Sequence, residues 1–353
     1  MSWVAAGQFL DRDSASLEEP HLRKTVISVW CVTDGTAGMQ HQAQALAAIM
    51  KWDQSPAFSD IVVKPHPILR SLPRLGRWAP NLPLVQNQNS PLAKIAKMRD
   101  FPSIMLTCGR RVAGISMALK TRAKRAGANM TTIHLQDPRL DPAFFDMLIV
   151  PHHDRVRGNN VIVTKAALNR ISQSHITASA KTLPHLWQTA AGPRVVVMIG
   201  GNNRRYKISY DMTTHMAQQL AAFASTNNAN LFLVPSRRCP DTVFKHLQTA
   251  LPQHHCMSTT NDQPNPYPGI LATADAVIVT SDSINMVSEA ASTGKPVLIA
   301  YWRPETGRIA KFHQTMRDNN HTERLTRFWP TRPFATLDES VVIRQQVHAL
   351  LMR

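Results

Sequence analysis

Cysteine is scarce in this chain, and the few cysteines are scattered. Cys31, Cys108, Cys239 and Cys256 form no C-x-x-C pair, and no histidine pattern suited to zinc accompanies them. Cys31 and Cys108 lie in apolar runs, where a buried and inert thiol is expected. The pattern argues against a disulfide-stabilised or zinc-bound domain and favours a reducing compartment.

Long apolar runs are also missing. No stretch approaches the roughly 18 apolar residues that a membrane-spanning helix needs. The N-terminal segment carries acidic side chains early and has no long apolar core, so it does not predict a signal peptide. We therefore expect a protein that is cytoplasmic or peripheral at a membrane.

Acidic residues and aromatic rings are few. The chain has 23 Asp and Glu against 40 Lys and Arg, a formal net charge of +17, and 6% aromatic residues. Such a charge concentrates anions at the surface, unless it serves solubility alone. The chain has no Lys/Arg tract and no nucleic-acid recognition motif. Phosphate-bearing substrates or an anionic membrane are therefore favoured, and nucleic acid is not expected.

What the chain does have is a repeating order of apolar strand, polar or glycine turn, and helix. Strands are predicted near 25–33, 103–108, 131–136, 145–151 and 160–165, and again near 194–199, 231–235, 275–280 and 295–300. This alternation is typical of parallel βαβ units. It predicts an α/β fold of two Rossmann-type parallel-sheet domains that face a central cleft.

The domain boundaries follow from breaks in this order. The segment 171–192 is predicted helical and closes on Ala191-Gly192-Pro193, after which the order restarts. We predict an N-terminal extension (1–23), a first domain (24–190), a second domain (191–325) and a helical tail (326–353).

A basic and apolar insertion at 64–98 interrupts the first domain. Arginines alternate there with leucines and a tryptophan, which suits an anionic membrane interface. The alternative is a long loop that packs its leucines onto its own domain. The residues concerned are Arg70, Arg74 and Arg77, with Leu69, Leu72, Leu75 and Trp78.

The end of the predicted strand 275–280 carries the strongest site signal. Ser281, Asp282 and Ser283 lead into a helix, with Ser283 or Asp282 as its N-cap. The unpaired N–H groups and the helix dipole there would hold a diphosphate. Glu289 shares a helical face with Asn285 and Met286, and its carboxylate would accept hydrogen bonds from ribose hydroxyls. The alternative is a capped helix with a solvated glutamate.

Other strand ends of the second domain carry matching polar residues. Two adjacent glycines allow close approach of a ligand to the backbone, and the pattern is not G-x-G-x-x-G, so NAD is not predicted. Each turn alone is ordinary, but the carboxyl ends of parallel strands lie along one edge of the sheet. The predicted donor site comprises Gly200, Gly201, Asn202, Arg204, Ser236, Arg237, Asn265, Asp282, Ser283, Met286 and Glu289.

The first domain offers candidate catalytic and acceptor-side residues. Asp34 is a candidate general base or a helix N-cap, and His152 is the second candidate base. The chain has no H-E-x-x-H motif, and we expect no metal and no cofactor. The acceptor side is predicted to contain Gly35, Thr36, Gly38, Arg110 and Asp137.

These motifs together resemble a known family. DGTAG, GRR, LQDPR, VPHHD, MIGGNNRRY and NPYPGILATADAVIVTSDSINMVSEAASTGKPV occur in the order seen in the family named for a plant elongated-mitochondria fission factor. The likeness runs from about residue 25 to 320, and bacterial members look like glycosyltransferases of cell-surface oligosaccharides. The C-terminal block is also similar to the donor-binding segment of GT-B enzymes such as the lipid-linked peptidoglycan N-acetylglucosaminyltransferase.

The resemblance implies a GT-B fold, with Ser283 on a donor phosphate and Glu289 on its ribose. It implies a metal-independent glycosyltransferase that moves a sugar from a nucleoside-diphosphate sugar to a lipid-linked or lipopolysaccharide-core acceptor. The enzyme would work in the cytoplasm or peripherally on the inner face of the bacterial inner membrane. The alternatives are a non-catalytic, membrane-associated GT-B-like adaptor and a nucleotide-sugar epimerase.

Overall fold

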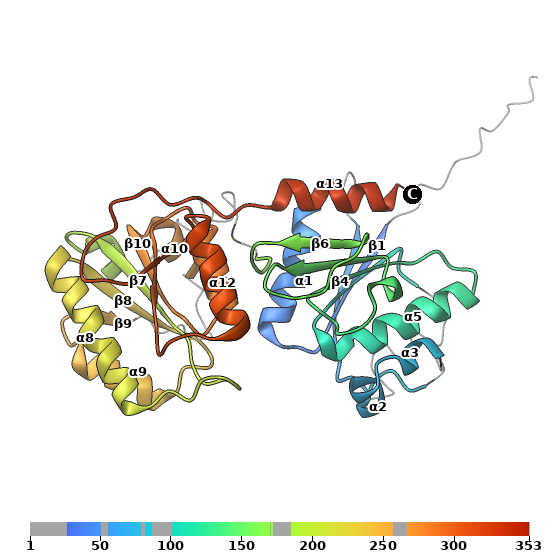
Figure 1. The fold of residues 1–353 in the computed structure, drawn as a ribbon, viewed down its shortest axis with the longest axis horizontal. Helices are drawn as coiled ribbons and strands as arrows, with labels where there is room; N and C mark the ends of the chain where they lie inside the picture. The colour runs from blue at the N-terminus through green and yellow to red at the C-terminus, as the bar shows by residue number, and fades with distance from the viewer. Residues whose placement is uncertain are drawn as a thin grey trace, which may run out of the picture.

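The computed structural model describes residues 27–50, 56–78, 82–86, 101–169, 171, 185–256 and 267–352. It consists of two α/β halves placed side by side, and a C-terminal helix extends from the second half back over the first (Figure 1). The predicted N-terminal extension lies outside the described residues, as does most of the segment predicted to be helical before the domain boundary.

The first half is built on a six-stranded parallel sheet with the order β2-β1-β3-β4-β5-β6. Its strands form where the apolar runs predicted them, because strands covered on both faces need apolar side chains throughout. The exposed edge strand β2 was not predicted, since only Ile61 of its residues is buried. The strands are β1 (Ser28–Thr33), β2 (Ala57–Val62), β3 (Ile104–Cys108), β4 (Thr131–Leu135), β5 (Met147–Pro151) and β6 (Val161–Thr164).

Helices cover both faces of this sheet. The face that includes Val29 and Leu106 packs against α1, and the face that includes Trp30 and Met105 packs against α5. The elements are α1 (Ala37–Ile49), α2 (Pro67–Ser71), α3 (Leu75–Trp78), η1 (Arg110–Val112), α5 (Ala113–Arg125) and η2 (Pro142–Phe144).

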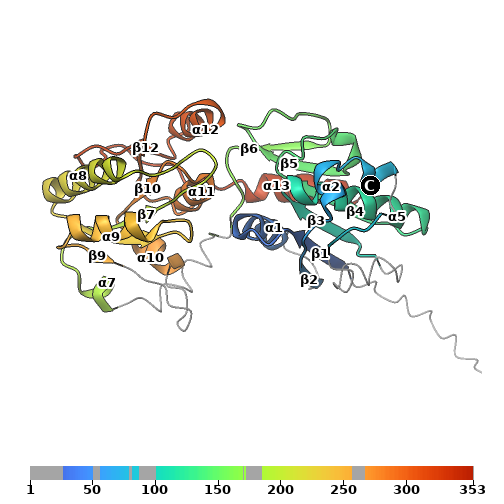
Figure 2. The same ribbon diagram turned by 90° about the horizontal axis from the view of Figure 1, so that it is seen from below.

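The second half contains a six-stranded parallel sheet with the order β12-β11-β10-β7-β8-β9, as in doubly wound dinucleotide-binding folds. One face packs against α8 and α9, and the other against α10, α11 and α12 (Figure 2). The strands are β7 (Arg194–Ile199), β8 (Asn230–Pro235), β9 (His255–Cys256), β10 (Ala276–Thr280), β11 (Val297–Ala300) and β12 (Glu323–Arg324). The helices are α7 (His185–Thr189), α8 (Tyr210–Asn227), α9 (Asp241–Ala250), α10 (Tyr267–Thr273), α11 (Ile284–Ala291) and α12 (Gly307–Asp318).

The last helix, α13 (Ser340–Leu351), packs on the first half although it follows the second in sequence (Figure 1). Ile343 and Val347 are buried in the same core as α1, and the Arg344 Nε donates a hydrogen bond to the Ile49 carbonyl at 2.8 Å. This helix therefore holds the two halves together from outside the sheets.

Part of the insertion packs its leucines onto its own domain, as one of the two alternatives expects. Leu69 and Leu84 are buried, and α3 packs so closely on α5 that a Cβ at Gly76 would lie 2.2 Å from the Gly114 carbonyl oxygen. Leu72 and Trp78 nevertheless remain 60% and 73% exposed. Residues 79–81 and 87–98 of the insertion lie outside the described residues.

None of the helices in the described ranges has both the length and the apolar content needed to cross a membrane.

Candidate functional site

Each sheet has a point where the strand order reverses, and the predicted site loops lie at these points. In the first half the reversal falls between β1 and β3, and in the second between β7 and β10. The loops after such a strand pair run to opposite faces of the sheet and leave a crevice, which is where ligands bind in open α/β folds. The Asp34 loop thus lies at the first reversal, and the Gly200 and Ser281 loops lie at the second.

The Asp282 side chain organises the second reversal point through contacts within the protein. Its carboxylate accepts hydrogen bonds from the Gly201 N–H at 3.0 Å, the Thr280 hydroxyl at 2.7 Å and the Trp302 indole N–H at 3.1 Å. Arg238 adds an ion pair at 3.4 Å. The Asp282 side chain is 0% exposed in this pair. Asp282 therefore ties the ends of β7, β8, β10 and β11 together.

The two adjacent glycines are required by this packing. A Cβ on Gly200 would lie 2.0 Å from an oxygen of Asp282, and a Cβ on Gly201 would lie 1.8 Å from the Arg238 carbonyl oxygen. From the sequence, these glycines were predicted to let a ligand approach the backbone closely. The structure shows a reason within the protein: the loops after β7, β8 and β10 touch one another at these glycines and leave no room for a side chain.

This packing gives a testable contrast between two glycines. Gly201→Ala places a methyl group against backbone, which cannot move aside easily, so we expect a loss of about 2 kcal/mol or more in unfolding free energy. Gly38→Ala meets only the Asn285 side-chain amide, 2.2 Å from the new Cβ, and this flexible group can rotate away. Urea unfolding followed by tryptophan fluorescence should therefore show a loss below about 1 kcal/mol for Gly38→Ala. Equal losses in the two variants would contradict this account.

The helix α11 begins at this reversal point with a largely unused N-terminus. Ser283 is its N-cap, as one of the two predicted choices, but the Ser283 side chain makes no capping hydrogen bond. Ser281, Asp282 and Ser283 are all buried. Among the described residues, the N–H groups of Ile284, Asn285 and Met286 have no hydrogen-bond partner. They therefore remain for an anion, which the helix dipole would also attract.

Glu289 lies farther along α11 and is half-buried, so it is not the fully solvated surface glutamate considered as the alternative. The Tyr267 hydroxyl, at the start of α10, donates a hydrogen bond to Glu289 Oε2 at 2.7 Å. Burial raises the pKa of the Glu289 carboxyl, and the Tyr267 hydrogen bond opposes that rise. Among the described residues, Oε1 has no hydrogen-bond partner. Met286, on the same face, is partly buried and packs against the same core as Tyr267.

The remaining predicted donor residues surround this turn. Asn202 donates its N–H to the Arg238 carbonyl and accepts from the Ile208 N–H at 2.9 Å. Arg204 and Arg237 are exposed, and the Ser236 hydroxyl accepts from the Arg238 N–H. Sequence reasoning chose Arg237, but its neighbour Arg238 is the one that pairs with Asp282. Asn265 lies outside the described residues.

The first half meets α11 directly through α1. The Gln42 side-chain amide donates to the Asn285 side-chain oxygen Oδ1 at 3.1 Å, and Gly38 lies against the same asparagine. Gly35 and Thr36, which precede α1, are exposed. The predicted acceptor-side turn therefore lies opposite the N-terminus of the predicted donor helix.

Asp34 is held in place by two contacts. Its Oδ1 accepts from the Thr36 N–H at 3.0 Å, and its Oδ2 lies 3.1 Å from the Arg111 guanidinium. Thr36 is the N-cap of α1, so the alternative interpretation of Asp34 as the N-cap is wrong. Arg110, which was predicted on the acceptor side, is exposed, whereas its neighbour Arg111 forms the ion pair.

A second contact between the halves brings together residues that the sequence analysis did not choose. The buried Asp154 carboxylate pairs with Arg308 at the start of α12. The neighbouring His153 is also buried, and desolvation, followed by the nearby Arg308 charge, lowers its pKa to about 4. Its imidazole is thus neutral at pH 7, and its Nδ1 has no hydrogen-bond partner among the described residues. Asp137 accepts from the Arg139 N–H at 2.7 Å in the adjoining turn.

His152 lies in a pocket of about 310 Å³ lined by both halves, with Lys165 from the first and Thr315 from the second. Its Nδ1 is 3.5 Å from the Thr315 hydroxyl. The strands β1 and β5 are three positions apart in the sheet, which at normal strand spacing separates their ends by about 14 Å. Asp34 and His152 therefore cannot share a proton, and only Asp34 lies opposite α11.

Within the described ranges, no group of three or more His, Cys, Asp and Glu side chains is arranged to hold a metal ion.

Comparisons with known proteins place this geometry in context. The chain is 29% identical over 314 residues to the uncharacterized protein RP120 of Rickettsia prowazekii (strain Madrid E), covering 78% of this chain and 83% of that protein. It is 27% identical over 261 residues to the mitochondrial fission protein ELM1 of Arabidopsis thaliana, covering 67% of this chain and 60% of that protein.

A solved structure also shares the fold. The UDP-GlcNAc 2-epimerase of Methanocaldococcus jannaschii matches with a TM-score of 0.51 at 9% identity, covering 93% of each chain. The predicted GT-B-like fold, which glycosyltransferases and nucleotide-sugar epimerases share, is confirmed. The model of the family described as mitochondrial fission ELM1 matches residues 37–351. The chain belongs to that family, which confirms the resemblance predicted from the sequence motifs.

Proposed function

We propose that this protein binds a nucleoside-diphosphate sugar at α11 and transfers the sugar to a lipid-linked or lipopolysaccharide-core acceptor. The observation that carries the proposal is the contact of α1 with α11, which sets the two sheet-reversal points against each other. A donor held at one and an acceptor held at the other would meet between them. The epimerase of the same fold is also named for a nucleotide sugar.

The donor would be held by groups already oriented for it. Its diphosphate would accept hydrogen bonds from the first N–H groups of α11, where the dipole and the exposed Arg204 and Arg237 favour negative charge. Its ribose hydroxyls would donate to Glu289, whose half-buried carboxylate has one oxygen without a hydrogen-bond partner among the described residues. The same groups would stabilise the diphosphate as it leaves, without a metal ion.

Asp34 would act as the general base. An acceptor hydroxyl would attack the anomeric carbon of the sugar, the bond to the diphosphate would break, and the hydroxyl proton would pass to the Asp34 carboxylate. The Asp34 side chain is 10% exposed and is held at the turn by the Thr36 N–H. Its partner Arg111 is 61% exposed, so the guanidinium can move aside.

The test is a calorimetric titration of the purified protein with UDP, GDP, CMP, ADP and their common sugar conjugates. We expect saturable binding of one nucleotide, and transfer of its labelled sugar into the lipid fraction of bacterial membranes. A labelled nucleotide sugar whose stereochemistry changes without any acceptor would instead identify an epimerase. A failure of every nucleotide to bind would contradict the donor site and favour the adaptor.

The acceptor proposal rests on the exposed part of the insertion. Ile68, Leu72 and Trp78 are 43%, 60% and 73% exposed. Arg70, Arg74 and Arg77 lie among them and are also exposed. Apolar side chains that enter the headgroup region, surrounded by cations, suit an anionic lipid surface. We propose that these six residues bring the first half to the membrane that holds the acceptor.

Vesicle binding tests this surface. Each arginine near an anionic membrane contributes about 1 kcal/mol, so Arg70→Gln/Arg74→Gln should weaken binding to phosphatidylglycerol-containing vesicles by roughly 10-fold or more. Trp78→Ser should also weaken it. The matched control is Phe328→Ser, because Phe328 is 58% exposed beside Arg327 on the second half. Equal effects of Trp78→Ser and Phe328→Ser would contradict the assignment of this surface.

A further inference from the structure

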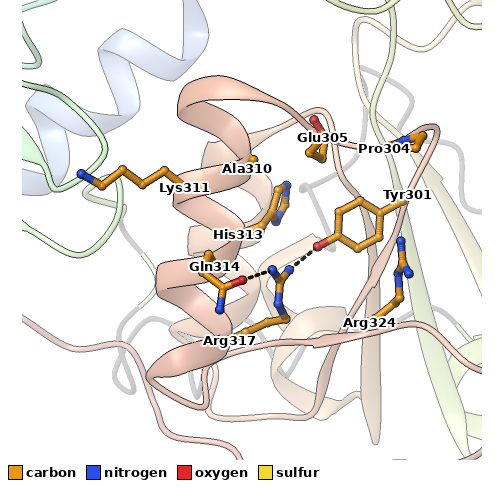
Figure 3. Close-up of a pocket in the computed structure, with 9 residues that line it drawn as sticks. All are labelled: Tyr301, Pro304, Glu305, Ala310, Lys311, His313, Gln314, Arg317 and Arg324. Atoms are coloured by element: carbon orange, nitrogen blue, oxygen red, sulfur yellow. Dashed lines mark hydrogen bonds between the residues drawn. The ribbon is translucent and has the colours of Figure 1, made fainter.

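A pocket of about 640 Å³ lies between α12, the connection from β11 to α12, and β12 (Figure 3). Its volume is in the range of small-molecule sites. None of the residues predicted from the sequence as site residues lines it. Its side chains come from Tyr301, Glu305, Lys311, His313, Arg317 and Arg324, among others.

The pocket carries an excess of positive charge. Lys311, Arg317 and Arg324 supply three cations, and within the described residues no ion pair joins any of them to a carboxylate. The pocket's own acid, Glu305, accepts a hydrogen bond from the Tyr206 hydroxyl. An anion is therefore the ligand class that this charge favours.

Tyr301 sets the two guanidinium groups at one wall of the pocket (Figure 3). Arg317 Nη1 donates a hydrogen bond to the Tyr301 hydroxyl at 2.6 Å, and the Arg324 guanidinium lies 5.0 Å from the centre of the Tyr301 ring. Arg317 Nη2 donates to the Gln314 side-chain oxygen at 2.6 Å. Held in this way, both guanidinium groups keep further N–H donors for a ligand, and guanidinium geometry matches phosphate oxygens.

His313 adds a hydrogen-bond acceptor to the same pocket. The residue is 1% exposed, and its Nε2 lies 2.9 Å from the Ser281 carbonyl oxygen. A carbonyl only accepts, so Nε2 carries the proton and Nδ1 is the acceptor. Nδ1 has no hydrogen-bond partner among the described residues. A buried acceptor without a partner is costly, and a ligand hydroxyl would satisfy it.

We propose that this pocket binds a phosphate ester that also carries hydroxyl groups, such as a sugar phosphate. The phosphate would lie against Arg317, Arg324 and Lys311, and a hydroxyl would donate to His313 Nδ1. The inference does not rest on the donor site, because none of these groups belongs to the predicted set around α11. The Ser281 carbonyl is the point where the two sites adjoin.

Calorimetric titration of the full chain with glucose 1-phosphate tests the proposal, with inorganic phosphate and methyl glucoside for comparison. We expect saturable binding of glucose 1-phosphate, weaker binding of inorganic phosphate and none of methyl glucoside. Arg324→Gln and Arg317→Gln should each weaken binding about 10-fold, the loss of one charge-assisted hydrogen bond. Arg324 is exposed on an edge strand, so its variant reports on binding even where Arg317→Gln disturbs packing around Tyr301.

Two controls separate this pocket from other sites. Arg327→Gln removes a similar arginine, 4.8 Å from the Phe328 ring, that does not line the pocket, and it should leave the affinity unchanged. Glu289→Gln should also leave it unchanged. The proposal is overturned if glucose 1-phosphate does not bind, if Arg327→Gln weakens binding as much as Arg324→Gln, or if Glu289→Gln abolishes it. If glucose 1-phosphate binds and no nucleotide does, the donor site fails and this pocket stands.

Discussion

Replacing Asp282 by alanine is expected to lower the free energy of unfolding by about 3–5 kcal/mol. The substitution leaves the Gly201 N–H, the Thr280 hydroxyl and the Trp302 indole N–H without their acceptor in a buried turn. It also leaves Arg238 without its carboxylate. Urea unfolding followed by tryptophan fluorescence measures the loss, because Trp187 and Trp302 are both buried in the second half.

A matched variant separates this effect from the loss of any acidic residue. Asp241 is an exposed aspartate in the first turn of α9, where a carboxylate contributes only a few tenths of a kcal/mol to about 1 kcal/mol. Asp241→Ala should therefore cost far less than Asp282→Ala. A loss below 1 kcal/mol for Asp282→Ala would mean that the turn does not depend on this carboxylate.

Glu289→Gln is expected to have opposite effects on binding and stability. If the ribose hydroxyls of a donor hydrogen-bond to the charged carboxylate, its removal should weaken nucleotide binding by about 100-fold, equivalent to roughly 3 kcal/mol. In the unliganded protein the same substitution should raise the free energy of unfolding at pH 7, because burial raises the Glu289 pKa. A site residue that costs stability is typical of a binding function.

The stability gain should depend on pH in a defined direction. Since the folded-state pKa of Glu289 is raised above its ordinary value of 4.5, ionisation costs more in the folded chain than in the unfolded chain. The wild-type protein therefore loses stability as pH rises from about 4.5 through the folded-state pKa. Thermal melts should show no advantage of Glu289→Gln below pH 4.5 and a full advantage above that window. A variant that binds nucleotide normally, or that is less stable at pH 7, would contradict this role.

Much of the fold was predictable because burial on both faces makes parallel strands apolar throughout. The predicted run at 275–280 became β10, and the runs before Gly200 and Gly109 became β7 and β3. The edge strand β2 was not predicted, because it is exposed and only one of its residues is buried, so it has no apolar run. The turn at Ser281–Ser283 was also predictable, because a strand end, an N-cap residue and a helix lie within a few residues of one another.

The choice among neighbouring polar residues was not predictable. Arg237 and Arg238 are adjacent in the sequence, yet only Arg238 pairs with the buried Asp282. Likewise, Arg111 rather than Arg110 pairs with Asp34. Asp282 was predicted as a ligand-binding residue, but its carboxylate faces the protein. Side chains one residue apart point in different directions, and which of them turns inward depends on loops that approach from elsewhere in the chain.

Two parallel α/β halves with polar turns at their strand ends could be predicted from the sequence, because hydrophobic period and turn residues are local properties. Which turns meet depends on how the chain packs in three dimensions. Gly200 contacts Thr280 across 80 positions, and Gln42 contacts Asn285 across 243. The pocket around Tyr301 likewise forms only when α12 and β12 pack beside the end of β11. Such contacts depend on strand order and on the packing of one half against the other, which no local pattern specifies.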